Sequence, residues 1–257
     1  MKVIAVTNHK GGVGKTHTAF NLAGAYAENP ATRVLLIDLD PQMNLTGLFL
    51  GPEDRNPSLF DVLVEEMPLA QAIHQTRFPG IGIVPSSRRL RNLDAHLHNE
   101  PDAQTRLAEA LRELPADQYP YAVAILDCPP NLDLMTRNAL AAAQRVVVPI
   151  EAARFSAEGL DALLETVESM KRAVNRDLEI AGVLLSRFIN RRMTQQTYDR
   201  ALRERGLRLF RTKIKDSAVY AKAIEVGRPI TDFMHRSEFA NAFRDLVEEL
   251  EHAYAHS

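Results

Sequence analysis

A glycine-rich run with two lysines carries the clearest chemistry in this sequence. It reads Lys10-Gly11-Gly12-Val13-Gly14-Lys15-Thr16-His17. Glycines let successive backbone N–H groups turn toward a phosphate chain, and a helix that begins there adds positive potential. Lys15 can then reach the β- and γ-phosphates, and the Thr16 hydroxyl can bind Mg²⁺. The run therefore predicts a site for ATP and Mg²⁺ built from these eight residues.

The start of this run departs from the common phosphate-loop pattern, because His9 stands where that pattern has glycine. The next residue, Lys10, is hard to place in the phosphate site of its own subunit. It could instead reach the triphosphate of a facing subunit. We therefore expect an ATP-bridged homodimer in which both Lys10 and Lys15 act on the phosphates.

Two acidic motifs follow apolar runs that have the character of buried strands. Asp38 and Asp40 follow one run, and Asp127 follows another. Ligands gather at the carboxyl ends of parallel strands, so both motifs are expected beside the phosphate loop. Asp127 is suited to hold the magnesium shell and Asp40 to orient the attacking water, because phosphoryl transfer depends mainly on positioning and charge. Asp38 is expected to support the magnesium's water shell or Lys15.

The elements that must position these residues alternate between strands and helices, which predicts right-handed parallel crossovers. The expected strands cover residues 3–6, 34–37, 81–84, 123–126, 145–148 and 180–185. Helical patterns cover residues 102–114, 157–173 and 194–205, and a surface loop is expected at 52–57. The predicted fold is α/β, with a mostly parallel twisted sheet flanked by helices. Neither a repeat nor a long linker occurs, so a single domain over residues 1–257 is expected.

Composition limits the partners and the compartment. The 31 basic and 33 acidic residues nearly balance, so the whole chain has no general attraction to nucleic acid or anionic membrane. The single cysteine, Cys128, cannot form an intrachain disulfide, and the sequence has no signal peptide or bilayer-spanning apolar run. A reducing, cytoplasmic setting is therefore expected.

Positive charge is concentrated between residues 187 and 215, where only Asp199 and Glu204 oppose it in sequence. Such a surface can bind DNA phosphates without reading base sequence, with affinity that comes largely from counterion release. The alternative is a solvated helix face whose charges serve solubility. The predicted DNA contacts are Arg187, Arg191, Arg192, Arg211, Lys213 and Lys215.

Taken in order, the motifs resemble those of the deviant Walker-type ParA/MinD ATPases, and within them the ParA partition proteins. The resemblance covers nearly the whole chain and includes KGGVGKT, DLDPQMNLT, ILDCPP and FSAEGL. It implies a P-loop NTPase that hydrolyses ATP to ADP and phosphate with magnesium. It also implies that Lys10 is the signature lysine, that Thr16 and Asp127 bind the metal, and that Asp40 is the hydrolytic carboxylate.

The resemblance further implies a functional cycle. ATP-bound homodimers bind double-stranded DNA nonspecifically on the nucleoid, and a ParB-like centromere-binding protein stimulates hydrolysis and release during plasmid or chromosome segregation. One residue departs from the family pattern: His17 stands where a second threonine or serine is usual. Contact with the α-phosphate would then come from the backbone N–H of His17.

Other classes of protein share parts of this pattern. A ParA-like ATPase that positions a protein cargo would differ only in its partner, whereas a small-molecule ligase or kinase would need a metabolite pocket that the sequence does not indicate. MinD-like proteins end in a basic membrane-inserting helix, but residues 243–254 carry an acidic face, so no membrane binding is expected. Iron–sulfur carriers of the superfamily need several cysteine ligands, and the single cysteine of this chain argues against that class.

Overall fold

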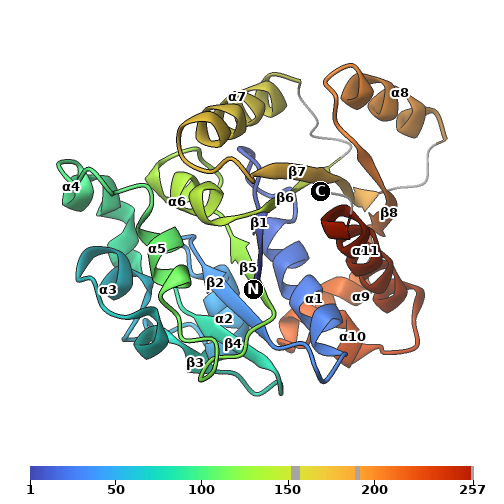
Figure 1. Ribbon diagram of the computed structural model, residues 1–257. Coiled ribbons are helices and arrows are strands. Elements are labelled where there is room, and N and C mark those ends of the chain that lie inside the picture. The colour runs from blue at the N-terminus through green and yellow to red at the C-terminus, as the bar shows by residue number, and fades with distance from the viewer. Residues whose placement is uncertain (152–156, 189–191, 256–257) are drawn as a thin grey trace.

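A twisted sheet of eight strands, in the order β3-β4-β2-β5-β1-β6-β7-β8, organises the chain, and every strand except β3 runs parallel to its neighbours. The computed structural model describes residues 1–151, 157–188 and 192–255 (Figure 1). The strands are β1 (Lys2–Val6), β2 (Val34–Asp38), β3 (His74–Gln75), β4 (Ile81–Val84), β5 (Val123–Asp127), β6 (Arg145–Glu151), β7 (Glu179–Phe188) and β8 (Leu209–Lys215).

Helices cover both faces of this sheet. They are α1 (Lys15–Ala27), α2 (Asn44–Leu50), α3 (Leu59–Val64), α4 (Leu93–Leu97), α5 (Arg106–Arg112), α6 (Leu134–Ala142), α7 (Ala157–Ala173), α8 (Arg192–Arg203), α9 (Ala218–Glu225), α10 (Ile230–Phe233) and α11 (Glu238–Ala255). Two short 3₁₀ turns, Leu69–Ala72 and Arg88–Asn92, complete the described elements.

Each face of the sheet has its own hydrophobic core, because the central strands are continuous apolar runs with side chains pointing alternately to the two sides. Along β1, Val3 and Ala5 belong to the core under α3 to α7. Ile4 and Val6 belong to the core shared with α1 and α9 to α11. The sheet is therefore held rigidly from both sides, and its carboxyl edge is a fixed platform for a site.

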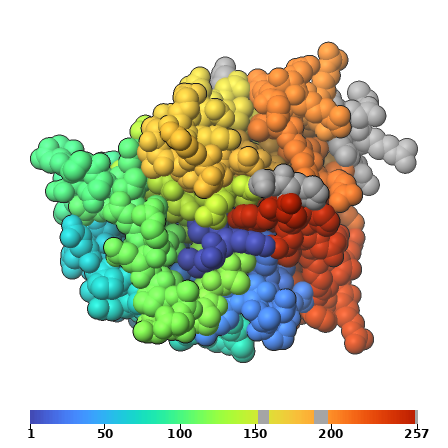
Figure 2. All heavy atoms as spheres, viewed as in Figure 1, coloured from blue at the N-terminus to red at the C-terminus, as the bar shows by residue number. Residues whose placement is uncertain are grey.

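The two ends of the described chain meet on one face of the molecule. Figure 2 shows the blue amino-terminal strand beside the red helix α11. Lys2 forms an ion pair with Glu251, and the Tyr254 hydroxyl donates to the carbonyl oxygen of Val3 at 3.2 Å. No helix among the described residues combines the length and apolar character needed to cross a membrane.

The predicted fold class is confirmed. All six predicted strands occur, and most are longer than predicted by one to several residues. The helix predicted over 157–173 is present with those bounds, whereas the one predicted over 102–114 is confined to Arg106–Arg112. Strands β3 and β8 were not predicted. In strand β8 basic residues alternate with buried ones, but this two-residue period is hard to distinguish within a stretch that is rich in basic residues throughout.

A buried carboxylate on α11 holds the edge strand β8. The register between β7 and β8 shifts within the pair. In β8 the backbone N–H groups of Arg211 and Thr212 donate to the Glu249 carboxylate at 3.0 and 2.8 Å, and the Arg208 guanidinium donates to it at 3.2 Å. Burial alone would raise the pKa of Glu249, but these hydrogen bonds lower it overall. Glu249 thus satisfies edge N–H groups that would otherwise lack partners.

We expect Glu249→Gln to lower the free energy of unfolding by about 2 kcal/mol at pH 7, because its amide cannot accept from both N–H groups equally well. A carboxylate whose folded pKa is lowered stabilises the protein above its unfolded value of 4.5, and that contribution is lost as the pH falls through the folded pKa. The difference in free energy of unfolding between wild type and Glu249→Gln should therefore become smaller below about pH 4.5. Urea unfolding at pH 7 and at pH 4 measures this difference.

The matched control for this prediction is Glu248→Gln, which alters an exposed carboxylate one residue earlier on the same helix. Its effect should stay within about 0.5 kcal/mol. Equal stability of Glu249→Gln and wild type at pH 7 would show that the edge strand does not depend on this carboxylate.

Candidate functional site

The phosphate loop connects the end of β1 to the start of α1. Gly12 and Gly14 adopt φ angles of 75° and 89°, a left-handed backbone that glycine takes without strain. The Ser186 hydroxyl, at the end of β7, donates to the carbonyl oxygen of Val13 at 2.6 Å and fixes the loop to the sheet. Helix α1 begins without a side-chain cap and without an acidic residue in its first turn. Its first N–H groups are therefore free of competing side-chain acceptors and suited to an anion.

Two further contacts shape the loop. The Asn8 side chain donates to the carbonyl oxygen of Pro149 at 2.7 Å and accepts from the backbone N–H of Lys10 at 3.0 Å. The Lys15 ammonium donates to the carbonyl oxygen of Lys10 at 3.0 Å, so it lies folded back along the loop. Burial lowers the pKa of Lys15, and the nearby Asp127, Cys128 and Asp40 oppose that effect.

Asp38 and Asp127 end neighbouring strands and stand directly opposite each other in the register of β2 and β5. The Asp38 carboxylate accepts from the backbone N–H and the hydroxyl of Thr46, both at 2.7 Å. Burial raises the pKa of Asp38 to about 7, although the bonds from Thr46 and the Asp40 N–H lower it. Asp38 is thus already engaged with protein donors.

Asp127 differs from Asp38 in having no such partners. Both of its carboxylate oxygens are buried, and neither has a hydrogen-bond partner of normal geometry among the described residues. Burial raises the pKa of Asp127 well above its ordinary value and the Asp38 charge adds to this, while the Thr16 hydroxyl and Lys15 act in the opposite direction. A buried acidic group with unsatisfied oxygens beside a hydroxyl is a suitable donor set for a hard divalent cation.

The third carboxylate, Asp40, faces a cavity of about 530 Å³. Its position is fixed on both sides: its own N–H donates to Asp38 at 3.1 Å, and its carboxylate accepts from the Gln42 N–H at 2.9 Å. Lys15 and Thr16 line the same cavity. The structure therefore brings together Lys15, Thr16 and Asp40 in the cavity wall, and the buried Asp127 is close enough to interact with all three.

The opposite wall of this cavity comes from the carboxyl-terminal third of the chain. It includes Ser186, Arg187, Ile214, Lys215, Asp216 and Tyr220. Sequence reasoning did not assign Ser186, Ile214 or Tyr220 to the site. The available signal was the position of Ser186 at the end of a predicted strand, where ligands of parallel sheets gather. Lys10 is not among the described residues that line the cavity.

His17 uses its side chain for packing. Its ring meets Tyr220 of α9 and Phe243 of α11 edge to face, with centroids 4.7 and 5.7 Å away. Burial lowers the pKa of His17 to about 4, and the charge of Arg187 acts in the same direction, so the imidazole is neutral at pH 7. The backbone N–H of His17, in the first turn of α1, remains the group for a phosphate contact.

The predicted DNA contacts lie in different parts of the structure, and Lys215 belongs to two of them. Arg211, Lys213 and Lys215 alternate with buried residues along β8 and so share its outer face. Arg187 and Lys215 line the phosphate-loop cavity. Arg191 lies outside the described residues, as does the side chain of Arg192.

The fold brings further acidic residues, distant in sequence, against this basic stretch. Arg211 lies 3.8 Å from Glu249 of α11, and Lys215 pairs with Glu238 at the start of the same helix. Arg205 forms a two-point ion pair with an aspartate of α7. The net charge of this surface is therefore smaller than the sequence indicated.

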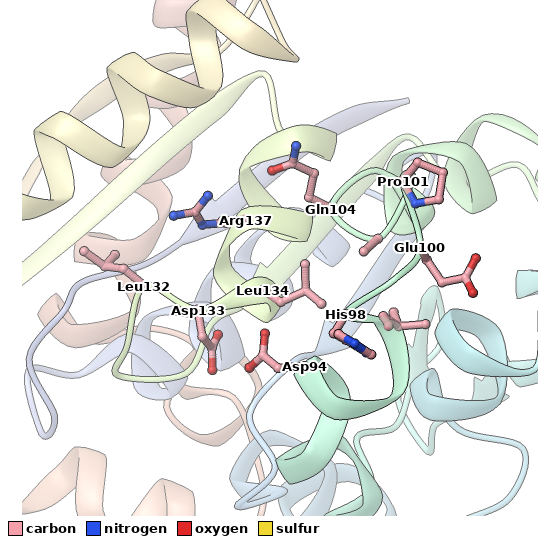
Figure 3. Close-up of a pocket in the computed structure, with 11 residues that line it drawn as sticks. Asp94, His98, Glu100, Pro101, Gln104, Leu132, Asp133, Leu134 and Arg137 are labelled. Atoms are coloured by element: carbon pink, nitrogen blue, oxygen red, sulfur yellow. The ribbon is translucent and has the colours of Figure 1, made fainter.

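A second cavity, of about 470 Å³, lies between α4 and α6 and shares no lining residue with the first. Figure 3 shows the carboxylates of Asp94 and Asp133 directed toward each other, with His98 nearby. Burial raises the pKa of Asp133 and the Asp94 charge adds to it, whereas the N–H groups at the start of α6 lower it. Asp133 caps that helix, so this carboxylate has a structural partner already.

Comparison with known proteins gives concordant results. A family described as an AAA domain matches residues 1–180. The chain is 35% identical to the chromosome partitioning protein ParA of Caulobacter vibrioides, over 97% of this chain and 94% of that one. It is 36% identical to the sporulation initiation inhibitor protein Soj of Bacillus subtilis, over 97% of this chain and 98% of that one.

Solved structures share the fold over the full length. Cobyrinic acid a,c-diamide synthase from Mycobacterium smegmatis, with bound ATP analog and magnesium, matches with a TM-score of 0.86 and 28% identity, covering 100% of this chain and 96% of that one. Apo McdA from Cyanothece matches with a TM-score of 0.84 and 25% identity, covering 97% of this chain and 99% of that one.

Proposed function

Because the chain belongs to the ParA family of the ParA/MinD superfamily of ATPases, we propose that it is a DNA partition ATPase driven by ATP and Mg²⁺. The family membership confirms the resemblance seen in the sequence motifs. The observation that carries the proposal is the meeting of Lys15, Thr16 and Asp40 in one cavity, above the unsatisfied carboxylate of Asp127. The structure of a similar protein with an ATP analog and magnesium supports the assignment of ATP and Mg²⁺ to this cavity.

The residues of the site fit this chemistry. The Thr16 hydroxyl and Asp127 would hold a magnesium ion, which would neutralise charge on the phosphates. Residues 11–17 direct backbone N–H groups at the phosphate chain. Lys15 leaves the Lys10 carbonyl oxygen and reaches the β- and γ-phosphates. Asp40 orients the attacking water, and Asp38, held by Thr46, fixes the backbone at Asp40.

Dimerisation follows in the proposal from the position of Lys10. This residue is partly exposed and lies outside its own cavity, so we assign its ammonium to the triphosphate of a facing subunit. ATP then bridges a homodimer, and hydrolysis separates it. We assign the whole cycle to one ATPase domain, residues 1–257.

The proposed DNA surface is the outer face of β8 with the neighbouring helix α8. Arg211 is 88% exposed, and Lys213 is half-buried beside it on the same face. Dimerisation places two such surfaces in one particle, which raises the number of DNA phosphates that can be neutralised. A ParB-like centromere-binding protein on the nucleoid then stimulates hydrolysis and releases the DNA. A ParA-like ATPase that moves a protein cargo would use the same cycle with another partner.

The test is duplex DNA binding across a salt series, with ATP analogue or ADP. With the analogue, the logarithm of affinity should fall steeply with the logarithm of salt, and Arg211→Ala should flatten the slope by about 0.9 for each DNA phosphate that the variant no longer neutralises. Lys10→Ala should bind DNA with the analogue no better than wild type does with ADP. Arg172→Ala, an exposed α7 residue, is the control. A wild type that dimerises with ATP but ignores DNA would contradict the partition function.

A further inference from the structure

Arg187 stands in the wall of the phosphate-loop cavity, although its sequence position groups it with the basic stretch. It follows Ser186, whose hydroxyl donates to the carbonyl oxygen of Val13 in the loop. The backbone of Arg187 is therefore one residue away from a direct contact with the phosphate loop. The wall around it also contains Asp216 and Tyr220.

The backbone conformation at Arg187 is one that glycine adopts more readily than arginine. Arg187 has a φ of 49°, a left-handed conformation that residues other than glycine seldom adopt. Strained backbone of this kind gathers at ligand sites, where the side chain has a use that offsets the strain. Glycine would fit the backbone without strain and would lack the guanidinium. The presence of arginine thus indicates a role for its side chain.

The present partners of the guanidinium hold it weakly. Its Nη1 lies 3.9 Å from Oε2 of Glu151, and its Nε lies 3.6 Å from Oδ1 of Asp216. Both separations exceed a hydrogen bond, and the Arg187 side chain is 53% exposed. The pair with Asp216 is exposed and so contributes little, and the pair with Glu151 is the longer of the two, so a phosphate oxygen can displace both carboxylates. The Arg187 charge is also felt at His17, in the first turn of α1.

We propose that Arg187 is a nucleotide-binding residue whose guanidinium exchanges Glu151 and Asp216 for oxygens of the α-phosphate. The inference rests on the proposed function, because it requires that the cavity bind ATP. Lys15 is assigned to the β- and γ-phosphates and Thr16 to the magnesium ion, which leaves the α-phosphate to the His17 end of the loop, where the charge of Arg187 acts. The planar guanidinium fork matches phosphate oxygens in geometry and charge. Arg187 accordingly belongs to the nucleotide site and not to the DNA surface.

The first experiment measures affinity for ADP and for a nonhydrolysable ATP analogue, both with Mg²⁺, by calorimetry. Arg187→Gly removes the side chain while suiting the left-handed backbone, and it should weaken both nucleotides by a similar factor of about tenfold. Arg187→Lys keeps the charge without the fork and should fall between Arg187→Gly and wild type. Arg172→Ala removes another exposed, ion-paired arginine, on α7, and should stay within about twofold of wild type.

A double-mutant cycle tests the exchange of partners. Asp216→Asn removes one competing anion and should tighten ADP binding a few-fold, but only when Arg187 is present to benefit. The same gain in the Arg187→Gly background would overturn the exchange. Thermal unfolding of every variant confirms that affinities are compared between folded proteins.

The outcomes separate this inference from the proposed function. If wild type binds neither nucleotide, the proposed function fails and the inference fails with it. If wild type binds both nucleotides and Arg187→Gly binds them equally well, only the inference is overturned. Unchanged nucleotide affinity together with weaker DNA binding at saturating ATP would return Arg187 to the DNA surface.

Discussion

Lys15→Ala is expected to lower ATP affinity by about a thousandfold, which amounts to loss of binding at cellular nucleotide concentrations. The change removes a buried ammonium that is proposed to contact both the β- and γ-phosphates, and each charge-assisted hydrogen bond is worth about 1.5–3 kcal/mol. It also removes a positive charge that offsets Asp127, so that carboxyl should hold its proton more strongly and bind magnesium less well. Calorimetry with ATP analogue and Mg²⁺ measures the loss.

The control for this prediction is Lys171→Ala on α7, which does not line the cavity. It should keep wild-type affinity. Lys15 is only 7% exposed, so unfolding of each variant should be followed as well. Near-normal ATP affinity in a folded Lys15→Ala protein would mean that the nucleotide lies elsewhere.

Asp40→Ala is expected to bind ATP within a few-fold of wild type and to hydrolyse it about a thousandfold more slowly. Positioned carboxylates that act on a reacting water typically contribute about 10²- to 10⁴-fold, and Asp40 is fixed by backbone bonds to Asp38 and Gln42. The Asp40 carboxylate is negatively charged and does not attract the phosphates, so ATP binding should survive its removal. Single-turnover phosphate release, with protein in excess over ATP, separates the two steps.

Asp40→Asn keeps the size of the side chain and its hydrogen bond from Gln42, and should be nearly as slow as Asp40→Ala. Asp54→Ala, in the exposed loop after α2, should keep the wild-type rate. A wild-type rate in Asp40→Ala would remove this residue from the mechanism.

The nucleotide half of the site was predictable because its signals are local. Lys15 and Thr16 stand in one short motif, and the end of a predicted parallel strand locates Asp40 and Asp127 by a general rule of such sheets. Their grouping in the structure agrees with that prediction. The roles of these residues stay predictions until the variants are measured.

The other half of the site depends on contacts between distant parts of the chain. The Ser186 hydroxyl meets Val13 across 173 residues of sequence, and Glu249 meets the N–H of Arg211 across 38. Nothing in the spacing of these residues indicates that they touch. The position of Arg187 beside the cavity likewise depends on how β7 follows β6 in the sheet. Sequence alone therefore grouped Arg187 by charge with Arg211 and Lys213, which do not line the cavity.

The alternation of side chains along β8 has a consequence for the energetics of the whole cycle. Ile214 faces the nucleotide cavity, while Arg211 and Lys213 face outward, so one strand borders the sites proposed for both ligands. When two ligands bias the same element, their coupling is reciprocal. If ATP raises the affinity for DNA by some factor, DNA must raise the affinity for ATP by the same factor. Protein bound to the nucleoid would then hold ATP more tightly than free protein does. A partner that opens the site would have to overcome this added affinity.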